Sequence, residues 1–274
     1  MTLRLSKHHG LGNDFLVLIG PADRLADVDA DLAVRLCDRH RGVGADGLLV
    51  GVLPAAGDDA DLTMTLFNAD GGVAEMSGNG IRCLAQAEAQ RRGTDHVDLR
   101  IATGGGPRPV QVRPGPAGDP ATVLVRVEMG SARPGPEADW QPAEPPAAAA
   151  LKAATVDLGN PHLVLLVDDA TAVPLDQDGP LHESCYDAGI NVHVVSRPAG
   201  DGSEAFMRTW ERGVGLTEAC GTGATAVAHA LHDWGLVGDT ITVHMPGGDA
   251  EVEVGEPMVL TGPATFVADV EVTA

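Results

Sequence analysis

Residue types that commonly hold cofactors or metals are scarce or scattered in this sequence. Among 274 residues only Lys7 and Lys152 are lysines, and pyridoxal phosphate enzymes need a lysine for their Schiff base. The four cysteines form no CxxC pair, and the ten histidines form no H-x-x-x-H or H-x-H pair, although His8 and His9 could approach His162. The spacing of the histidines and cysteines predicts no metal site, and the scarcity of lysine agrees with an enzyme that uses no pyridoxal phosphate cofactor.

Long apolar segments and basic clusters are also missing. No run of 18 apolar residues occurs, and the first residues, MTLRLSKHHGLGNDF, contain no apolar stretch long enough for a signal peptide. With 18 basic against 39 acidic residues, the formal net charge of -21 would repel a nucleic-acid backbone. We expect a cytoplasmic protein with reduced cysteines, no membrane partner and no nucleic-acid partner.

Short apolar strands broken by glycine and proline make up much of the chain, together with two helical segments. The segment NGIRCLAQAEAQRRG (79–93) has helical apolar spacing and ends on Arg91, Arg92 and Gly93, as helices often do. The segment TGATAVAHALHDWG (222–235) has the same features, with Gly235 as its terminator. Residues 134–150 are rich in proline and alanine and are expected to form a connecting loop.

The chain also repeats itself. Ser77 and Cys220 lie 143 positions apart (220 minus 77), in the similar turns EMSGNG (75–80) and EACGTG (218–223). The same offset relates other matching pairs: Met64 and Met207, Phe67 and Trp210, Gly72 and Gly215, and Glu75 and Glu218. GNDFLVL (12–18) similarly resembles GNPHLVL (159–165). The ordered series predicts two halves of one design, with chance similarity among glycine- and valine-rich segments as the alternative.

A glycine-rich turn that leads into a helix has a defined chemistry. Its free backbone N–H groups and the positive end of the helix dipole bind carboxylate or phosphate. A thiol at such a place is expected to have a lowered pKa and to act as a base near neutral pH. Two such turns on opposite sides of a substrate carbon would suit an amino-acid epimerase without a cofactor. One group would remove the α proton, and the other would return a proton to the opposite face, while the helix ends stabilise the developing charge.

Other interpretations of these turns are less favoured. GTGATA (221–226) matches the dinucleotide pattern G-x-G-x-x-A, but the first turn, GNGIRC (78–83), breaks it at Cys83. No G-x-x-x-x-G-K-[ST] phosphate-binding motif occurs. The structural alternative for Cys220 is a buried small residue, which is the role we expect for Cys37, Cys83 and Cys185.

Seven motifs, in order along almost the whole chain, are similar to those of the diaminopimelate epimerase family: HGLGNDF (9–15), FNADG (67–71), GNGIRC (78–83), GNPH (159–162), ERG (211–213), ACGTGA (219–224) and PGG (246–248). The resemblance implies an α/β (α+β) fold of two pseudo-symmetric domains, each a curved mixed β-sheet wrapped around a central helix, with the active site in the cleft between them. We expect domains of residues 1–117 plus 264–274 and of residues 118–263, the last strand returning to the first domain.

The resemblance also implies the reaction and its residues. The family converts LL-diaminopimelate to the meso isomer, for lysine and peptidoglycan synthesis, without pyridoxal phosphate or metal, and a homodimer is expected by the same resemblance. Cys220 matches one of two catalytic cysteines, and Ser77 stands where the other is expected. The substrate-binding positions are four asparagines, an acidic and a basic residue, and donors beside the reactive positions: Asn13, Asn68, Asn160, Asn191, Glu211, Arg212, Gly78, Asn79, Gly221 and Thr222. Gly47 stands where some members have Gln.

Ser77 departs from the family pattern. An alcohol is far less acidic than a thiol, so Ser77 is expected to be a poor general base at neutral pH. Three interpretations stay open: an epimerase that keeps its substrate site but is impaired, a related racemase or dehydratase that acts on another amino acid through Cys220, and a catalytically inactive protein that binds an amino acid.

Overall fold

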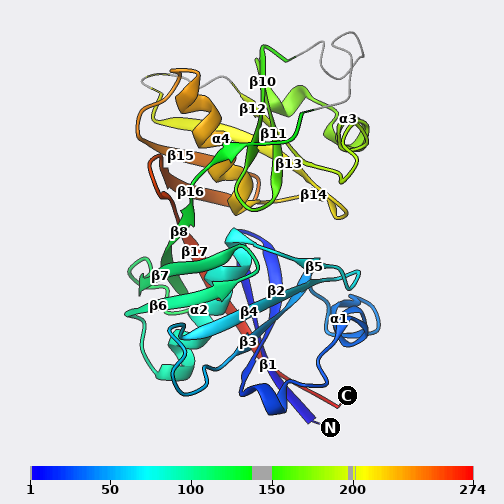
Figure 1. Ribbon diagram of the computed structural model, residues 1–274, viewed down its shortest axis with the longest axis vertical. Coiled ribbons are helices and arrows are strands. Elements are labelled where there is room, and N and C mark those ends of the chain that lie inside the picture. Colours follow the sequence, from blue (N-terminus) through cyan, green and yellow to red (C-terminus); the bar gives the residue numbers. More distant parts are fainter. Residues whose placement is uncertain (1, 138–149, 197–199, 201, 274) are drawn as a thin grey trace. The chain divides into compact units, whose positions relative to one another are not determined.

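The computed structural model describes residues 2–137, 150–196, 200 and 202–273 (Figure 1), so most of the predicted loop at 134–150 lies outside the described residues. The chain forms two compact units, Met1–Glu128 with Thr261–Ala274, and Met129–Leu260. The boundaries were expected after residues 117 and 263. The first lies later because β8 (Thr122–Gly130) pairs with β7 (Gly106–Pro114) from Val123 to Val127 and so continues the sheet of unit 1.

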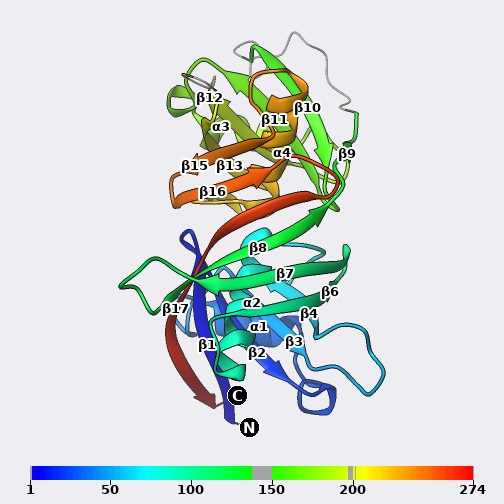
Figure 2. The same cartoon turned by 90° about the vertical axis from the view of Figure 1, so that its left-hand side faces the viewer.

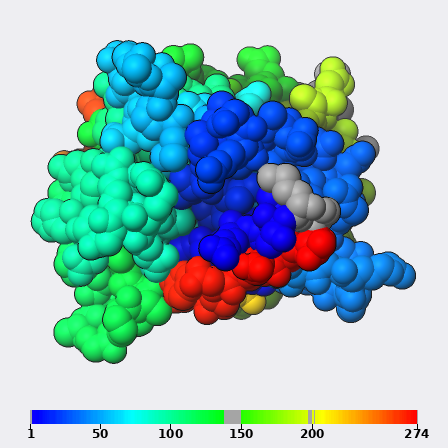
Figure 3. Space-filling model, turned by 90° about the horizontal axis from the view of Figure 1, so that it is seen from below, coloured from blue at the N-terminus to red at the C-terminus, as the bar shows by residue number. Residues whose placement is uncertain are grey.

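Unit 1 is a curved mixed sheet with one long helix. Its other elements are β1 (Thr2–Gly10), β2 (Asn13–Gly20), the 3-10 helix η1 (Ala22–Arg24), α1 (Ala30–Cys37), β3 (Gly47–Val52), β4 (Leu62–Asn68), β5 (Val73–Ala74), α2 (Gly78–Arg92), β6 (Val97–Thr103) and the C-terminal part of β17 (Met258–Thr273). Strand β17 pairs antiparallel with β1, from Thr2 opposite Thr273, and also pairs with β8. Figure 3 shows the end of β17 beside the first strand.

The helix α2 is the core of unit 1. It lies among the strands of unit 1 (Figure 2) and contacts β1, β2, β3, β4, β6 and β7. Every residue from Gly78 to Ala89 is buried. The polar residues among them are satisfied inside the unit: Arg82 donates to the Gly78 and Pro263 carbonyl oxygens, and Glu88 accepts from Arg91 and Arg92. A helix buried on all sides needs strands around it, which the curved sheet provides.

Unit 2 repeats this plan. Its elements are β9 (Arg133–Pro134), β10 (Lys152–Asp157), β11 (Pro161–Val167), the 3-10 helix η3 (Ala170–Ala172), α3 (Leu175–Glu183), β12 (Asn191–Ser196), β13 (Glu204–Glu211), β14 (Gly215–Thr217), α4 (Gly221–Asp233), β15 (Thr240–Met245) and β16 (Gly248–Glu253). The helix α4 contacts β10, β11, β12, β15 and β16, and its residues from Gly221 to Ala228 are buried.

The strand pairings confirm the internal repeat. In unit 1, β1–β2 is antiparallel, β2–β3 parallel, β3–β4 and β4–β5 antiparallel, β4–β6 parallel and β6–β7 antiparallel. Unit 2 shows the same series: β10–β11 is antiparallel, β11–β12 parallel, β12–β13 and β13–β14 antiparallel, β13–β15 parallel and β15–β16 antiparallel. Both predicted helices are present at the expected places, and Gly93 and Gly235 follow them with φ of 70° and 71°, the left-handed conformation that ends a helix.

Candidate active site

The repeated turn places Ser77 and Cys220 at the same point of the two units. Ser77 is the N-cap of α2 and Cys220 the N-cap of α4, with φ/ψ of -141°/121° and -131°/111°. Ser77 Oγ accepts a hydrogen bond from the backbone N–H of Gly80 at 3.0 Å, and Cys220 Sγ accepts one from Gly223 at 3.3 Å. Each reactive atom therefore lies at the positive end of a buried helix, where negative charge is favoured.

In unit 1, a hydrogen bond joins the predicted site residue Asn13 to Asn79, which lies in the first turn of α2 beside Gly78. Asn79 Nδ2 donates to Asn13 Oδ1 at 3.2 Å, and Asn13 Nδ2 donates to Asp46 Oδ2 at 2.8 Å. Arg82 donates to Asn79 Oδ1 at 2.8 Å and to the carbonyl oxygen of Gly78 at 3.1 Å. The side chains of Asn13 and Asn79 are thus held in one orientation next to the turn that carries Ser77.

Asn68 is brought to the same end of the sheet by strand pairing. It is the last residue of β4 and lies opposite Gly47, the first residue of β3. A Cβ atom at Gly47 would lie 2.8 Å from the Phe67 carbonyl oxygen, which is too close for an unstrained side chain. The glycine at this position is therefore required by the local backbone, and a glutamine would need the strands to shift.

In unit 2, Asn160 and Asn191 connect different elements. Asn160 Oδ1 lies 2.9 Å from His162 Nε2, and its Nδ2 donates to Thr222 Oγ1 at 3.4 Å. Asn191 donates to the Pro161 carbonyl oxygen at 2.9 Å and accepts from the Arg212 backbone N–H at 3.0 Å. Asn160 is thereby held beside the start of α4, and Asn191 beside the turn that follows β13.

Glu211 and Arg212 lie at the end of β13 and in the turn that follows it, and their charged groups have different hydrogen-bond partners. Glu211 Oε1 accepts a hydrogen bond from the Thr217 hydroxyl at 2.6 Å. The Arg212 guanidinium donates to the Ala188 carbonyl oxygen at 3.0 Å from an exposed position. A guanidinium offers two parallel donors to a carboxylate, and Glu211 can accept from an ammonium group, so the pair suits an amino acid.

The expected lowering of the Cys220 pKa is wrong for this structure. Cys220 is 4% exposed, and burial raises the pKa of its thiol far above the ordinary value, with the negative charge of Glu211 raising it further. The Thr222 hydroxyl and the Gly223 N–H act in the opposite direction but do not outweigh burial. The motif placed the thiol at the correct helix end, but the neighbours that remove water from it come from elsewhere in the fold.

The other three cysteines differ in burial. Cys37 and Cys83 are buried, as expected of structural residues, and burial raises their pKa values to about 11 and about 12. Cys185 is only partly buried, contrary to the expectation, and its Sγ donates to the Leu181 carbonyl oxygen at 3.3 Å. None of these three occupies a helix N-cap among the described elements.

Two buried histidines of unit 2 escaped the sequence interpretation. His162 Nδ1 lies 2.8 Å from His193 Nε2, and neither ring is exposed. The sequence left open an approach of His8 or His9 to His162, and His8 bonds Gln86 and Ser6 within unit 1. A usable signal was present, since GNPH and INVH both place a histidine two residues after an asparagine on neighbouring parallel strands.

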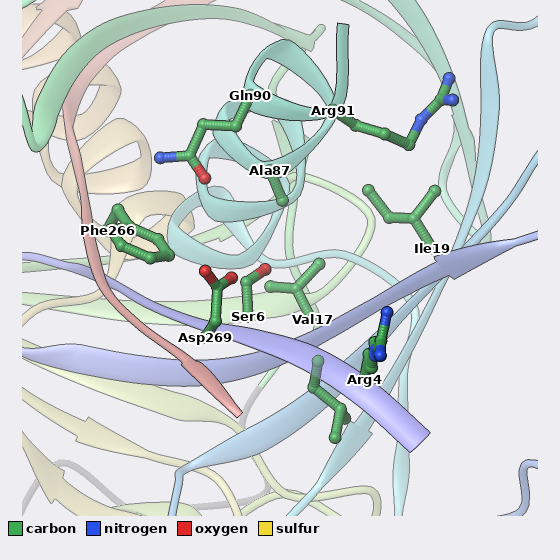
Figure 4. A pocket seen from close by; sticks show the side chains of 10 residues that line it. Arg4, Ser6, Val17, Ile19, Ala87, Gln90, Arg91, Phe266 and Asp269 are labelled. Atoms are coloured by element: carbon green, nitrogen blue, oxygen red, sulfur yellow. The ribbon is translucent and has the colours of Figure 1, made fainter. Parts of the chain in front are cut away.

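A hollow of about 480 Å³ in unit 1 is separate from these residues (Figure 4). It is lined by side chains of β1, β2, the second half of α2 and β17, among them Arg4, Gln90, Phe266 and Asp269. It contains none of the predicted site residues, so nothing links it to chemistry at Ser77 or Cys220.

Among residues 2–137, 150–196, 200 and 202–273, no group of three or more His, Cys, Asp or Glu side chains is placed to hold a metal ion. Within the same ranges, each helix is too short or too polar to cross a membrane.

Comparison with known proteins gives consistent relatives over the full length. The family model "Diaminopimelate epimerase" matches residues 5–134 and 154–267. Diaminopimelate epimerase of Synechococcus elongatus is 38% identical over 289 aligned positions, covering 97% of both chains. Diaminopimelate epimerase of Pseudomonas syringae pv. tomato is 37% identical over 288 positions, covering 99% of both.

Solved structures show the same two-domain fold at lower identity. A Bacillus anthracis phenazine biosynthesis protein of the PhzF family superposes with a TM-score of 0.74 at 15% identity, covering 100% of both chains. A predicted epimerase from Pseudomonas aeruginosa has a TM-score of 0.72 at 18% identity, covering 99% of both. With sequence relatives and family model in agreement along the chain, this protein belongs to the diaminopimelate epimerase family.

Proposed function

We propose that this protein is an isomerase that converts LL-diaminopimelate to the meso isomer by proton transfer at one α carbon, without pyridoxal phosphate and without a metal. Family membership supports the substrate and the reaction. The observation that carries the mechanism is the matched pair of N-caps, Ser77 and Cys220. The proposal requires the two groups to act on opposite faces of one carbon.

Cys220 would act on one face of the α carbon, donating a proton as the thiol and removing one as the thiolate. Burial keeps its thiol protonated at neutral pH in the free structure. To remove a proton in the other direction it must become a thiolate, and the Gly223 N–H and the Thr222 hydroxyl are the donors that stabilise this charge. The N–H groups of Gly221 and Thr222 are in the first turn of α4, where they would bind the substrate α-carboxylate.

Ser77 would limit the rate. Its hydroxyl has the place of a second proton-transfer group, and Gly78 and Asn79 supply the matching backbone donors at the start of α2. An alcohol is almost never ionised near neutral pH, so proton removal from this side is slow. We therefore propose an epimerase that binds its substrate but is impaired by Ser77.

Diaminopimelate has an amino-acid group at each end, so its site needs acceptors for two ammonium groups and donors for two carboxylates. Arg212 would hold a carboxylate through two hydrogen bonds, and Glu211 would accept from an ammonium group. The asparagines Asn13, Asn68, Asn160 and Asn191 would complete the site, because an amide both donates and accepts. We further expect a cytoplasmic homodimer, from family resemblance alone.

Ser77 also favours two alternative functions. A protein with a single reactive thiol would suit a one-sided reaction of another amino acid, or it would bind an amino acid without turnover. Ligand binding separates these candidates more directly than sequence does.

Isothermal titration calorimetry with LL-diaminopimelate, meso-diaminopimelate and L-lysine tests the substrate. Lysine lacks one carboxylate, so we expect it to bind at least about tenfold more weakly than either isomer. Arg212→Lys keeps the charge but loses the paired donors, and should weaken diaminopimelate binding by about tenfold. Failure of both isomers to bind, while another amino acid binds, would overturn the substrate assignment.

A further inference from the structure

A chain of hydrogen-bonded side chains runs through the interior of unit 2 and ends at the Cys220 thiol. It begins at Thr209, whose Oγ1 lies 3.1 Å from His193 Nδ1, and His193 Nε2 lies 2.8 Å from His162 Nδ1. His162 Nε2 in turn lies 2.9 Å from Asn160 Oδ1. The last two contacts join Asn160 Nδ2 to Thr222 Oγ1 at 3.4 Å and Thr222 Oγ1 to Cys220 Sγ at 3.5 Å. The residues come from β13, β12, β11 and α4, so the chain crosses three strands before it reaches the helix.

Both imidazoles in this chain are neutral. The rings of His162 and His193 are 0% exposed, and burial lowers their pKa values, that of His193 to about 3. A neutral imidazole has one N–H donor and one nitrogen that accepts. Between Nδ1 of His162 and Nε2 of His193 there is therefore one shared proton, and its position determines the direction of every bond in the chain.

Asn160 fixes that direction. Its Oδ1 can only accept, so His162 donates from Nε2 and must accept at Nδ1. His193 then donates from Nε2 and accepts at Nδ1 from the Thr209 hydroxyl. At the other end, Asn160 Nδ2 donates to Thr222, which leaves the Thr222 hydroxyl hydrogen to point toward Cys220 Sγ.

His193 also supports the start of α4 directly. A Cβ atom at Gly223 would lie 2.2 Å from Cε1 of the His193 ring, so the helix backbone rests on the imidazole. Gly223 is the residue whose N–H donates to the Cys220 sulfur. The His193 ring therefore acts on both donors to Cys220. It orients the Thr222 hydroxyl through the series of hydrogen bonds, and it fixes the Gly223 N–H by direct contact with the helix backbone.

We propose that Thr209 and His193 are positioning residues for Cys220: they hold His162 in its Nε2–H tautomer, so that Asn160 donates to Thr222 and Thr222 donates to the sulfur. Neither residue would touch the substrate. The donor aimed at Cys220 stabilises the thiolate, the form that removes a proton. This inference rests on one part of the proposed function, namely that Cys220 is a reactive residue.

Nitrogen NMR of the wild-type protein tests the direction of the chain. Long-range proton–nitrogen spectra of ¹⁵N-labelled protein distinguish the two neutral tautomers, and His162→Gln and His193→Gln identify the signals by their loss. We expect the neutral Nε2–H tautomer for both rings at pH 7. An Nδ1–H tautomer at His162 would overturn the proposal, because the chain would then run away from the sulfur.

A pair of variants at Thr209 tests the consequence. Thr209→Val keeps the shape but removes the hydroxyl, and Thr209→Ser keeps the hydroxyl. Alkylation of Cys220 by iodoacetamide, followed by peptide mass spectrometry from pH 7 to pH 10, should be about three- to tenfold slower in the valine variant and close to wild type in the serine variant. Cys185, which is only partly buried and takes no part in these hydrogen bonds, is the internal control and should react equally in all three proteins.

The alkylation readout needs no substrate, so it is independent of the titration that tests the proposed function. Equal alkylation of Cys220 in the wild type and Thr209→Val would overturn the positioning role, as would equal slowing in the valine and serine variants. If Thr209→Val does not fold, the wild-type tautomers still decide the question.

Discussion

Ser77 and Cys220 differ by one atom, and that atom decides which proton transfers each residue can make. Both accept a hydrogen bond from the N–H group three residues later, so the fold treats them alike. A thiol ionises far more readily than an alcohol, although burial raises the pKa of the Cys220 thiol above its ordinary value. We therefore expect Cys220, and not Ser77, to carry most of the proton transfer.

Cys220→Ala is predicted to abolish any exchange of the substrate α hydrogen with solvent, because no other described thiol caps a helix beside the candidate site residues. The measurement is proton NMR of LL-diaminopimelate in D2O. Cys185→Ala removes the partly exposed thiol and serves as the control, with exchange unchanged. Exchange by Cys220→Ala at the rate of the unmodified protein would refute the role of Cys220.

The buried histidine pair predicts how stability depends on pH. The folded pKa values of His162 and His193 lie below the unfolded value near 6.5, so only the unfolded state takes up protons as the pH falls through 6.5. The free energy of unfolding should fall by about 1.4 kcal/mol per histidine for each pH unit below 6.5, until the folded pKa is reached. Buried His8, whose pKa is also lowered by burial, adds to this slope.

Urea unfolding of the protein between pH 7.5 and pH 5, followed by tryptophan fluorescence, measures this dependence. His193→Gln replaces one of the two rings with a side chain that does not titrate. Its slope should be smaller by the contribution of one histidine. An identical slope in the variant and the wild type would contradict the assignment of neutral, buried rings.

The sequence motifs identified the candidate residues but not their ionisation. Cys220 and Ser77 stand out because the same glycine pattern surrounds both. The pKa of Cys220 depends on burial by residues of other elements and on Glu211, which no local pattern reveals. The His162 and His193 pair likewise depends on the parallel pairing of β11 with β12, which joins segments 31 positions apart (193 minus 162).

At the scale of elements, the two central helices begin in the same way but rest on different neighbours. Gly80 and Gly223 occupy equivalent positions, three residues after the N-cap. A Cβ atom at Gly80 would lie 3.2 Å from the side chains of Leu49 and Ser77, whereas one at Gly223 would lie 2.2 Å from the His193 ring. The start of α4 is thus the more tightly packed of the two.

Gly223→Ala is predicted to destabilise the protein by about 2–3 kcal/mol, because the His193 ring or the helix must move. Gly80→Ala is the matched variant in the other unit and should cost about 1 kcal/mol or less, since the Leu49 and Ser77 side chains need to shift by only a few tenths of an ångström. Chemical unfolding of both variants measures the difference. Equal losses would show that the ring does not support α4.

The elements themselves were largely predictable, and their pairing was not. Apolar spacing and the terminal glycines gave both long helices, and the offset of 143 positions gave the repeat. The order of strands was not available from the sequence, because β4 pairs with β6 and β13 with β15 across the whole intervening helix. The closing of unit 1 by β17 came only from family resemblance, since β1 and β17 lie at opposite ends of the chain.

At the scale of the whole molecule, the net charge of -21 dominates. Repulsion among the acidic side chains opposes the compact state, and salt screens it over about 10 Å at 0.1 M. The melting temperature should therefore rise by roughly 3–5 °C between 10 mM and 200 mM NaCl, as measured by differential scanning calorimetry. A melting temperature that stays constant or falls over this range would contradict a stability limited by charge.

We propose that Ser77 occupies the place of a second proton-transfer group in a diaminopimelate epimerase. Proton NMR of LL-diaminopimelate in D2O, with the wild-type protein and Ser77→Cys, tests it most directly. We predict that the variant exchanges the α hydrogen and forms the meso isomer at least about a hundredfold faster than the wild type. A folded Ser77→Cys protein that binds the substrate but neither exchanges nor inverts it would contradict the claim.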